Sequence, residues 1–501
     1  MTRLPALIAT TLVLALTLGT LVPLLLRADS FALTTADLAV LRFTLLQAFL
    51  SAALSCLLAI PVARALARRR FPGRAALITL LGAPFILPVI VAILGLLAIF
   101  GRAGLLNTLL APLGLPPLDP YGLQGILLAH VFFNLPLATR FLLIGWQAIP
   151  AEHLRLAASL NLPISLLERP LLRRILPGAF TAIFLLCLTS FATALTLGGG
   201  PAATTIELAI YQSLRFDFDP GRAALLSLLQ LALCAATALA AARLTPPPTA
   251  APGLDRQLPF PATGPLARAL DATALALAAA FLLLPLAATV LSGAPALLSL
   301  PPEVWAAAAR SLVMALASTA LTLALALPLA LTPGRLTTLA GSLPLATSAL
   351  VLGTGLFLIL HPIANPLALA LPVTVTVNAV MALPFAVRTL APAAAETEAT
   401  YGRLATSLRL TGLARLRILI LPRLRRPLGF AAGLAAALAM GDLGVIALFA
   451  DAEQATLPLA MYRLMGAYRM EEAAGAALLL LILSLALFRL FDRGHRPDAQ
   501  P

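Results

Sequence analysis

The chain has 501 residues, of which 61% are hydrophobic and only 11% are charged, whereas about a quarter of the residues in a soluble globular protein are charged. This composition excludes an ordinary soluble domain and predicts an integral membrane protein. The net charge of +14 comes from arginine alone among the basic residues, because the sequence contains no lysine.

The first half of the chain contains six apolar segments that are long enough to cross a bilayer as helices. They cover residues 4–26, 43–62, 75–100, 122–146, 178–197 and 223–242. The first segment resembles a signal peptide, but its apolar core is too long and no small-residue cleavage motif follows, so we predict an uncleaved helix. Residues 198–220, which include Glu207, are expected to form a flexible outer loop.

A proline-rich linker, residues 243–268, separates this half from a second one and is predicted to be extended. The second half repeats the scheme with apolar segments at 269–290, 311–331, 339–360, 371–390, 428–450 and 473–490. We therefore predict an all-α membrane protein with about twelve spans. Its halves are residues 1–242 and 269–491, with cores at about 41–242 and 307–490, and its tail is 492–501.

The arginines are distributed unevenly between the two sides that this topology defines. If alternate loops face opposite sides, 26 of the 34 arginines fall on one side and 8 on the other. Such an asymmetry is typical of multispanning proteins, whose arginine-rich loops stay in the cytoplasm. We therefore expect both termini to be cytoplasmic, and the charge does not indicate binding to nucleic acid.

A basic amphipathic loop occurs once in each half, between the fourth and fifth spans. The first copy contains RLAASL from Arg155 to Leu160, and the second contains RLATSL from Arg403 to Leu408, 248 residues later. The same offset aligns Arg140 with Arg388, and similar offsets align later segments of the two halves. The sequence therefore contains an internal repeat, and both loops are predicted to face the cytoplasm.

Motifs of enzymes and metal sites are missing from the sequence. The phosphate-binding loop G-x-x-x-x-G-K-[ST] requires a lysine, and we find neither a nucleophile elbow nor an HExxH motif. The three cysteines lie singly in apolar segments, and the four histidines show no ligand spacing. We expect no bound cofactor or metal and no catalysis by this chain, and a passage between its two halves is the better expectation.

Two matching loops on one side are suited to binding two copies of a partner protein. The alternative is that they lie on anionic lipid headgroups, where each arginine contributes about 1 kcal/mol. We favour a partner protein, because the repeat RLA[AT]SL preserves small and apolar residues as well as charge.

At these loops the chain resembles the permease subunits of binding-protein-dependent ABC importers. Their loop carries an EAA motif followed by a glycine and, later, an I-x-L-P motif, and it docks as a coupling helix on the ATPase. In this chain Leu156-Ala157-Ala158 and Leu404-Ala405-Thr406 stand at the EAA positions, while Asn161 and Arg409 replace the glycine. The resemblance implies the type I importer permease fold (MetI-like). It also implies a coupling site formed by Glu152, Leu156, Ala157, Ala158, Asn161, Arg403, Leu404, Ala405 and Arg409.

Four further segments are similar to the thiamine permeases of this family, whose two halves are also fused. They are RRFPGRAAL (69–77), PYGLQGILLAHVFFNLP (120–136), SFATALTLGGGPAATTIELAIYQ (190–212) and GDLGVIALF (441–449). The resemblance implies import of thiamine and its phosphate esters, delivered by a periplasmic binding protein and driven by two copies of a separate ATPase in the bacterial inner membrane. A fused permease for ferric iron and an ion-gradient secondary transporter remain as alternatives.

Asp442 lies inside the eleventh predicted span, where a carboxylate costs about 2.5–3.5 kcal/mol on insertion scales. A carboxylate on the transport pathway would favour passage of the positive thiazolium ring of thiamine. The alternative is a packing or gating contact with a polar group of a neighbouring helix.

Overall fold

The computed structural model describes residues 4–28, 32–82, 86–160, 162–163, 165–244, 264–366, 368–449 and 453–492. Most of the predicted linker, the tail after Asp492 and Asn161 lie outside these residues. Every regular element of the described chain is a helix. Eleven of these helices are long and apolar enough to cross a membrane, and a bent pair makes twelve, so the predicted class of fold is confirmed.

The first half begins with the helices of the first four spans. They are α1 (Leu4–Leu18), α2 (Leu21–Arg27), α3 (Thr35–Arg68), α4 (Arg74–Leu80), α5 (Val89–Phe100), α6 (Leu105–Leu110) and α7 (Leu123–Gln147). The remainder of this half consists of α8 (Ala151–Ser159), α9 (Ser165–Leu188), α10 (Phe191–Leu197), α11 (Ile206–Arg215) and α12 (Pro220–Leu244).

The second half follows the same order. Its helices are α13 (Pro265–Ala296), α14 (Pro302–Leu331), α15 (Arg335–Ser342), α16 (Ala349–Leu360), α17 (Ala370–Ser407), α18 (Gly412–Arg415), α19 (Leu421–Met440), α20 (Gly444–Phe449), α21 (Leu457–Gly466) and α22 (Met470–Asp492). A 3-10 turn (Leu343–Ala346) separates α15 from α16, and a π-helical turn (Leu416–Ile420) separates α18 from α19.

The third and ninth predicted spans are wrong as continuous helices. The segment predicted at 75–100 divides into α4 and α5, and the one at 339–360 divides into α15 and α16, which meet at 98°. Pro88 directly precedes α5, and Pro344 lies in the turn before α16. A proline lacks the amide proton that helix continuation needs and disfavours helical geometry at the preceding residue, so both breaks follow from the sequence.

The fifth and eleventh spans also break, and they do so at corresponding positions. Helix α9 ends at Leu188 and α19 ends at Met440, 252 residues later, and a short helix follows each break. Inside a bilayer such irregular backbone is tolerated only where protein buries it or where it lines a cavity. The two breaks are therefore expected in the interior of the protein or along a cavity.

The outer loop predicted at 198–220 is not flexible, because it contains helix α11 with a largely buried face. A hydroxyl group anchors the start of this helix, since Thr44 Oγ1 of α3 accepts a hydrogen bond from Ile206 N at 2.9 Å. In the second half Ser311 Oγ of α14 accepts from Leu457 N at 2.8 Å, at the start of α21. This matched pair of contacts shows that the internal repeat is also structural.

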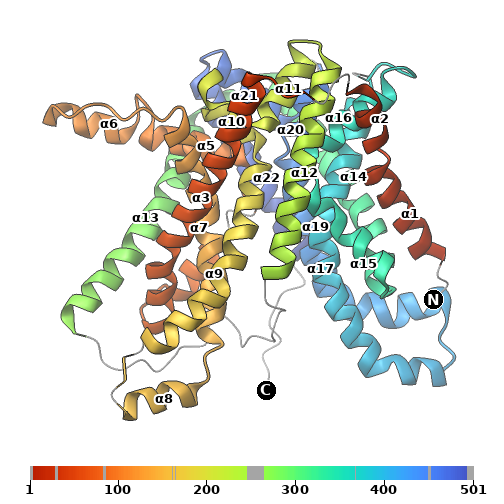
Figure 1. The fold of residues 1–501 in the computed structure, drawn as a ribbon, viewed down its shortest axis with the longest axis horizontal. Helices are drawn as coiled ribbons and strands as arrows, with labels where there is room; N and C mark the ends of the chain where they lie inside the picture. Colours follow the sequence, from red (N-terminus) through yellow and green to blue (C-terminus); the bar gives the residue numbers. More distant parts are fainter. Residues whose placement is uncertain are drawn as a thin grey trace.

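The first span of each half lies against the opposite half (Figure 1). Helices α1 and α2 contact α14, α15 and α16 of the second half as well as α12 of their own half, and α13 contacts α3 and α5 of the first half as well as α22 of its own half. Close approach is required at Gly95 of α5, where a Cβ atom would lie 2.4 Å from the carbonyl oxygen of Pro285 in α13. The two halves therefore interlock through their first helices.

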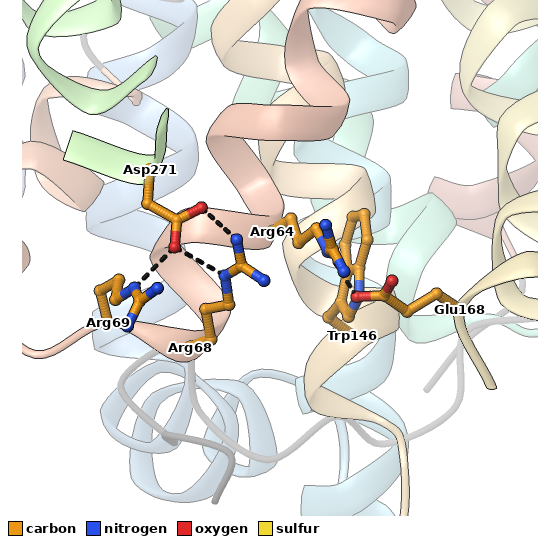
Figure 2. A network of polar contacts seen from close by, with 6 residues as sticks. All are labelled: Arg64, Arg68, Arg69, Trp146, Glu168 and Asp271. Atoms are coloured by element: carbon orange, nitrogen blue, oxygen red, sulfur yellow. Dashed lines mark hydrogen bonds and ion pairs between the residues drawn. The ribbon is translucent and has the colours of Figure 1, made fainter. Parts of the chain in front are cut away.

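Charged residues connect α13 to α3 at one end of the helices (Figure 2). The carboxylate of Asp271 accepts hydrogen bonds from Arg68 Nε at 2.8 Å and from Arg69 Nε at 2.6 Å. The side chains of Arg68 and Asp271 are each only 7% exposed. Beside them Arg64 donates to Glu168 at 2.8 Å, which connects α3 to α9.

Replacing Asp271 with Ala is expected to destabilise the protein by about 3 kcal/mol, because a buried charge of Arg68 would lose its partner. Thermal unfolding of the purified protein in detergent measures the change. The control is Asp119→Ala, which breaks the exposed ion pair between Arg102 and Asp119 and should cost no more than about 1 kcal/mol. Equal losses in the two variants would contradict the prediction.

Candidate functional site

Both predicted loops lie at the same end of the molecule (Figure 1). Helix α8 crosses below the first half, and the end of α17 projects below the second half. The two loops differ in shape, because Pro150 follows α7 whereas Glu398 stands at the repeat position of Pro150 inside α17. Proline ends one helix and glutamate lets the other continue.

The exposed faces of the two loop helices correspond closely. Leu156 is 57% exposed and Leu404 is 55% exposed, whereas Ala157 and Ala405 are buried at 6% and 2%. Glu152, Arg403 and Arg409 are exposed, and so are Leu160 and Leu408, one turn beyond the first pair of leucines. Ala158 lies in α8, and Asn161 lies outside the described residues.

This arrangement divides the predicted coupling residues into two groups. The leucines present an apolar edge, because residues four apart share one face of a helix, while the two alanines pack inside their own loops. Leu160 and Leu408 were not among the predicted residues. Their spacing from Leu156 and Leu404 is the signal in the sequence that identifies them.

Both loop helices end in the same hydrogen-bonded turn. Leu162 N donates to Ala157 O at 2.8 Å, and Leu410 N donates to Ala405 O at 2.9 Å, the long bond of a Schellman motif. In the second loop Arg409 N also donates to Thr406 O at 3.1 Å, and Arg409 has a φ of 52°. This left-handed conformation explains why related permeases carry glycine at the corresponding position.

Replacing Arg409 with Gly is expected to raise the free energy of unfolding by up to about 1 kcal/mol, because glycine adopts positive φ without the steric cost that other residues bear. The midpoint of thermal unfolding measures the gain. Ser407→Gly is the matched control, since Ser407 ends the helix with ordinary geometry and glycine there should destabilise it. Destabilisation by both variants would contradict this expectation.

Side-chain contacts hold the second loop together. The guanidinium of Arg415 donates to Glu398 at 2.6 Å, joining the far side of the loop to the end of α17. The guanidinium of Arg423 lies 4.4 Å from the ring centroid of Tyr401, within the range of a cation–π interaction. The two contacts therefore connect α17 to α18 and to α19 across the loop.

Asp442 lies at the break between α19 and α20. Its carboxylate accepts hydrogen bonds from the backbone amides of Gly444, Val445 and Ile446, the first turn of α20. Its Oδ2 atom is buried and has no partner of normal hydrogen-bond geometry among the described residues, although Asn378 lies close by. The carboxylate thus caps α20 and lies beside the amide of Asn378 on α17, which is a polar contact with a neighbouring helix.

The break that holds Asp442 packs against the first half. A Cβ atom on Gly441 would lie 3.1 Å from Pro88, before α5, and one on Gly444 would lie 3.5 Å from Phe191, at the start of α10. Phe191 and Val445 belong to one hydrophobic cluster that spans both halves. The structure therefore places the break that holds Asp442 at a contact between the two halves.

A second buried carboxylate was missed by sequence reasoning. Glu207 of α11 is 1% exposed, and it accepts a hydrogen bond from Gln230 Nε2 of α12 at 2.9 Å. The hydroxyl of Ser348, before α16 of the other half, also contacts it. The signal in the sequence is the apolar run TIELAIY around Glu207, which is unlike that of an exposed loop.

Burial raises the pKa of Glu207 to about 8, against the lowering effect of the hydrogen bonds from Ser348 and Gln230. Because the folded protein holds this proton more tightly than the unfolded chain, stability is full below about pH 4.5 and falls as pH rises toward 8. Between pH 6 and pH 8 the wild type is expected to lose roughly 2 kcal/mol more than Glu207→Gln. Thermal unfolding at the two pH values measures this, and equal losses would contradict the expectation.

Comparisons with known proteins find relatives that match most of the chain. The chain is 44% identical over 475 residues to the thiamine transport system permease protein ThiP of Brucella abortus, covering 91% of this chain and 87% of the relative. It is 42% identical over 516 residues to ThiP of Escherichia coli, covering 98% and 96%.

A more distant relative covers only one part of the chain. The molybdenum transport system permease protein ModB of Mycobacterium bovis is 30% identical over 200 residues, which is 39% of this chain and 75% of the relative. No protein-family model and no solved structure matches the chain. Identity of this level over nearly the whole length shows that the chain belongs to the family of thiamine transport system permease proteins.

Proposed function

We propose that this chain is the membrane-spanning permease of an ATP-driven importer, which moves thiamine and its phosphate esters from a periplasmic binding protein to the cytoplasm. The observation that supports the mechanism best is the pair of loops with matching exposed leucines at one end of the molecule. The substrate follows from the relatives, which are named for thiamine transport.

In this proposal each loop docks on one copy of a separate ATPase subunit. The exposed pairs Leu156 with Leu160 and Leu404 with Leu408 enter apolar grooves, and Glu152, Arg403 and Arg409 contact the rim. The contacts of Arg415 with Glu398 and of Arg423 with Tyr401 support a mechanical role. They make the second loop rigid, and a rigid loop transmits motion of the ATPase to α17 and α19. Hydrolysis takes place on the partner, so this chain binds no ATP.

The chain is a multi-pass protein of the inner membrane. The end that carries both loops is also the end where α3 finishes (Figure 1), and Arg64, Arg68 and Arg69 lie in the last turns of that helix and directly after it. Since arginine-rich ends stay in the cytoplasm, we place this end and both termini there and the opposite end, with α11 and α21, in the periplasm. The binding protein docks on that outer end.

We place Asp442 on the transport pathway. A buried carboxylate at the contact between the halves attracts the positive thiazolium ring, and the same residue caps α20. A binding site and a structural contact are thus combined in one side chain, whose two roles are separable by substitution.

The decisive experiment is uptake of labelled thiamine by proteoliposomes that contain the permease, the ATPase and the binding protein. Uptake is expected only with ATP on the side of the ATPase, and ferric iron is not expected to compete. Accumulation by the permease alone along an ion gradient would overturn the proposal in favour of a secondary transporter. Competition by ferric iron would overturn the choice of substrate.

A further inference from the structure

A cavity of about 890 Å³ lies between α4 of the first half and α13, at the end of the helices that carries the two loops. Its walls are apolar and include Leu77, Leu80, Leu275 and Leu283. Its mouth is basic, because Arg69, Arg70 and Arg268 line it together with Asp271. The coupling loops and Asp442 lie elsewhere, so this cavity is separate from the site described above.

The charge at the mouth is not balanced within the described part of the chain. Among the described residues Asp271 is the only acidic one that lines the cavity, and it is engaged by Arg68 and Arg69. Arg70 and Arg268 are exposed and have no ion pair with a described residue. Two arginines are thus available to bind an anion next to an apolar surface.

The length of the cavity matches one half of a bilayer. Arg268 and Leu283 both lie on α13, and a rise of about 1.5 Å per residue separates them by about 22 Å along the helix. A membrane with its headgroup layers is about 40–45 Å thick, so one leaflet spans nearly the same distance. A ligand that fills this cavity therefore combines an anionic head with an apolar chain of that length.

We propose that this cavity binds an anionic phospholipid of the inner leaflet, with its phosphate between Arg70 and Arg268 and an acyl chain along Leu77, Leu275 and Leu283. Basic pockets between spanning helices on the cytoplasmic side are suited to such headgroups. The lipid fills the space beside α13 where the two halves interlock. This inference does not depend on the identity of the transported substrate.

Native mass spectrometry of the delipidated, full-length protein tests the site by titration with phosphatidylglycerol, phosphatidylcholine and soluble glycerol 3-phosphate. We expect at least tenfold tighter binding of phosphatidylglycerol than of phosphatidylcholine. We expect no binding of glycerol 3-phosphate at the same concentrations, because it lacks the acyl chains. The double variant R70Q/R268Q should bind phosphatidylglycerol about 25-fold more weakly, at about fivefold for each arginine.

Two further variants test whether the lipid occupies the apolar part of the cavity and whether the overall charge of the protein affects binding. Ala276→Trp fills the apolar part of the cavity without a change of charge, and it should weaken phosphatidylglycerol binding to a similar extent. Arg335→Gln, at the start of α15 in the second half, removes an exposed charge outside the cavity and should leave binding unchanged.

Three results would overturn the proposal. Equal binding of the two phospholipids would show that the arginines do not select the headgroup. Unchanged binding in Ala276→Trp would show that the lipid binds outside this cavity. Binding of glycerol 3-phosphate as tight as that of the lipid would identify a site for free phosphate esters.

Discussion

Replacing Leu156 and Leu404 together with Asp is expected to abolish ATP-driven uptake and to release the ATPase from the permease. Burial of one leucine in a groove contributes about 1.5–3 kcal/mol, and a carboxylate in the same groove would lose its hydration without a partner. For two loops the combined loss is about 3–6 kcal/mol, which weakens the complex by two to four orders of magnitude. Co-purification of the ATPase and its stimulated hydrolysis measure the effect.

The control for this experiment replaces the same leucines with Met, a residue of similar volume and polarity, and should retain the ATPase. The thermal unfolding midpoint of the permease alone should not change in either double variant, because both leucines are exposed. Normal retention of the ATPase by the Asp variant would show that the ATPase does not dock through these leucines.

Ala157→Glu and Ala405→Glu are also expected to uncouple the ATPase, but by a different route. Both alanines are buried in their own loops, so a glutamate there disrupts the loop before it meets any partner. These variants should lower the unfolding midpoint of the permease, which distinguishes them from the leucine variants.

Replacing Asp442 with Asn is expected to slow thiamine uptake at least tenfold while assembly with the ATPase stays normal. Asparagine is as good a helix cap as aspartate, so the hydrogen bonds to the start of α20 are preserved and only the negative charge is lost. Attraction between opposite unit charges 4 Å apart is worth about 4 kcal/mol at an effective dielectric of 20. A tenfold loss of rate requires only about 1.4 kcal/mol of this.

The matched variant Asp442→Ala removes the charge and the cap together. It should lower both uptake and the unfolding midpoint, whereas the Asn variant should lower uptake alone. Normal flux per assembled complex in Asp442→Asn would refute the pathway role and leave Asp442 as a structural cap.

The position of Arg409 illustrates what sequence and structure each contribute. Comparison of the loop with the family pattern shows that an arginine replaces a glycine, but the pattern alone does not say what the glycine does. The φ of 52° and the hydrogen bond of Leu410 to Ala405 supply the reason. A loop of this kind needs a left-handed residue after its helix, and arginine accepts that conformation at a cost.

Composition and pattern alone predict the class of fold, the internal repeat and the two matching loops, because apolar length, charge and repeated motifs can be read from neighbouring residues. They do not predict that α1 packs on the second half and α13 on the first, that Glu207 is buried or that Asp271 pairs with Arg68. The hydrogen bond of Glu207 joins residues 23 positions apart, the pair of Asp271 with Arg68 joins residues 203 positions apart, and the contacts of α1 and α2 with the second half reach farther still. Only tertiary packing brings such residues together, since apolar helices of similar length have no local signal that selects their neighbours in a membrane.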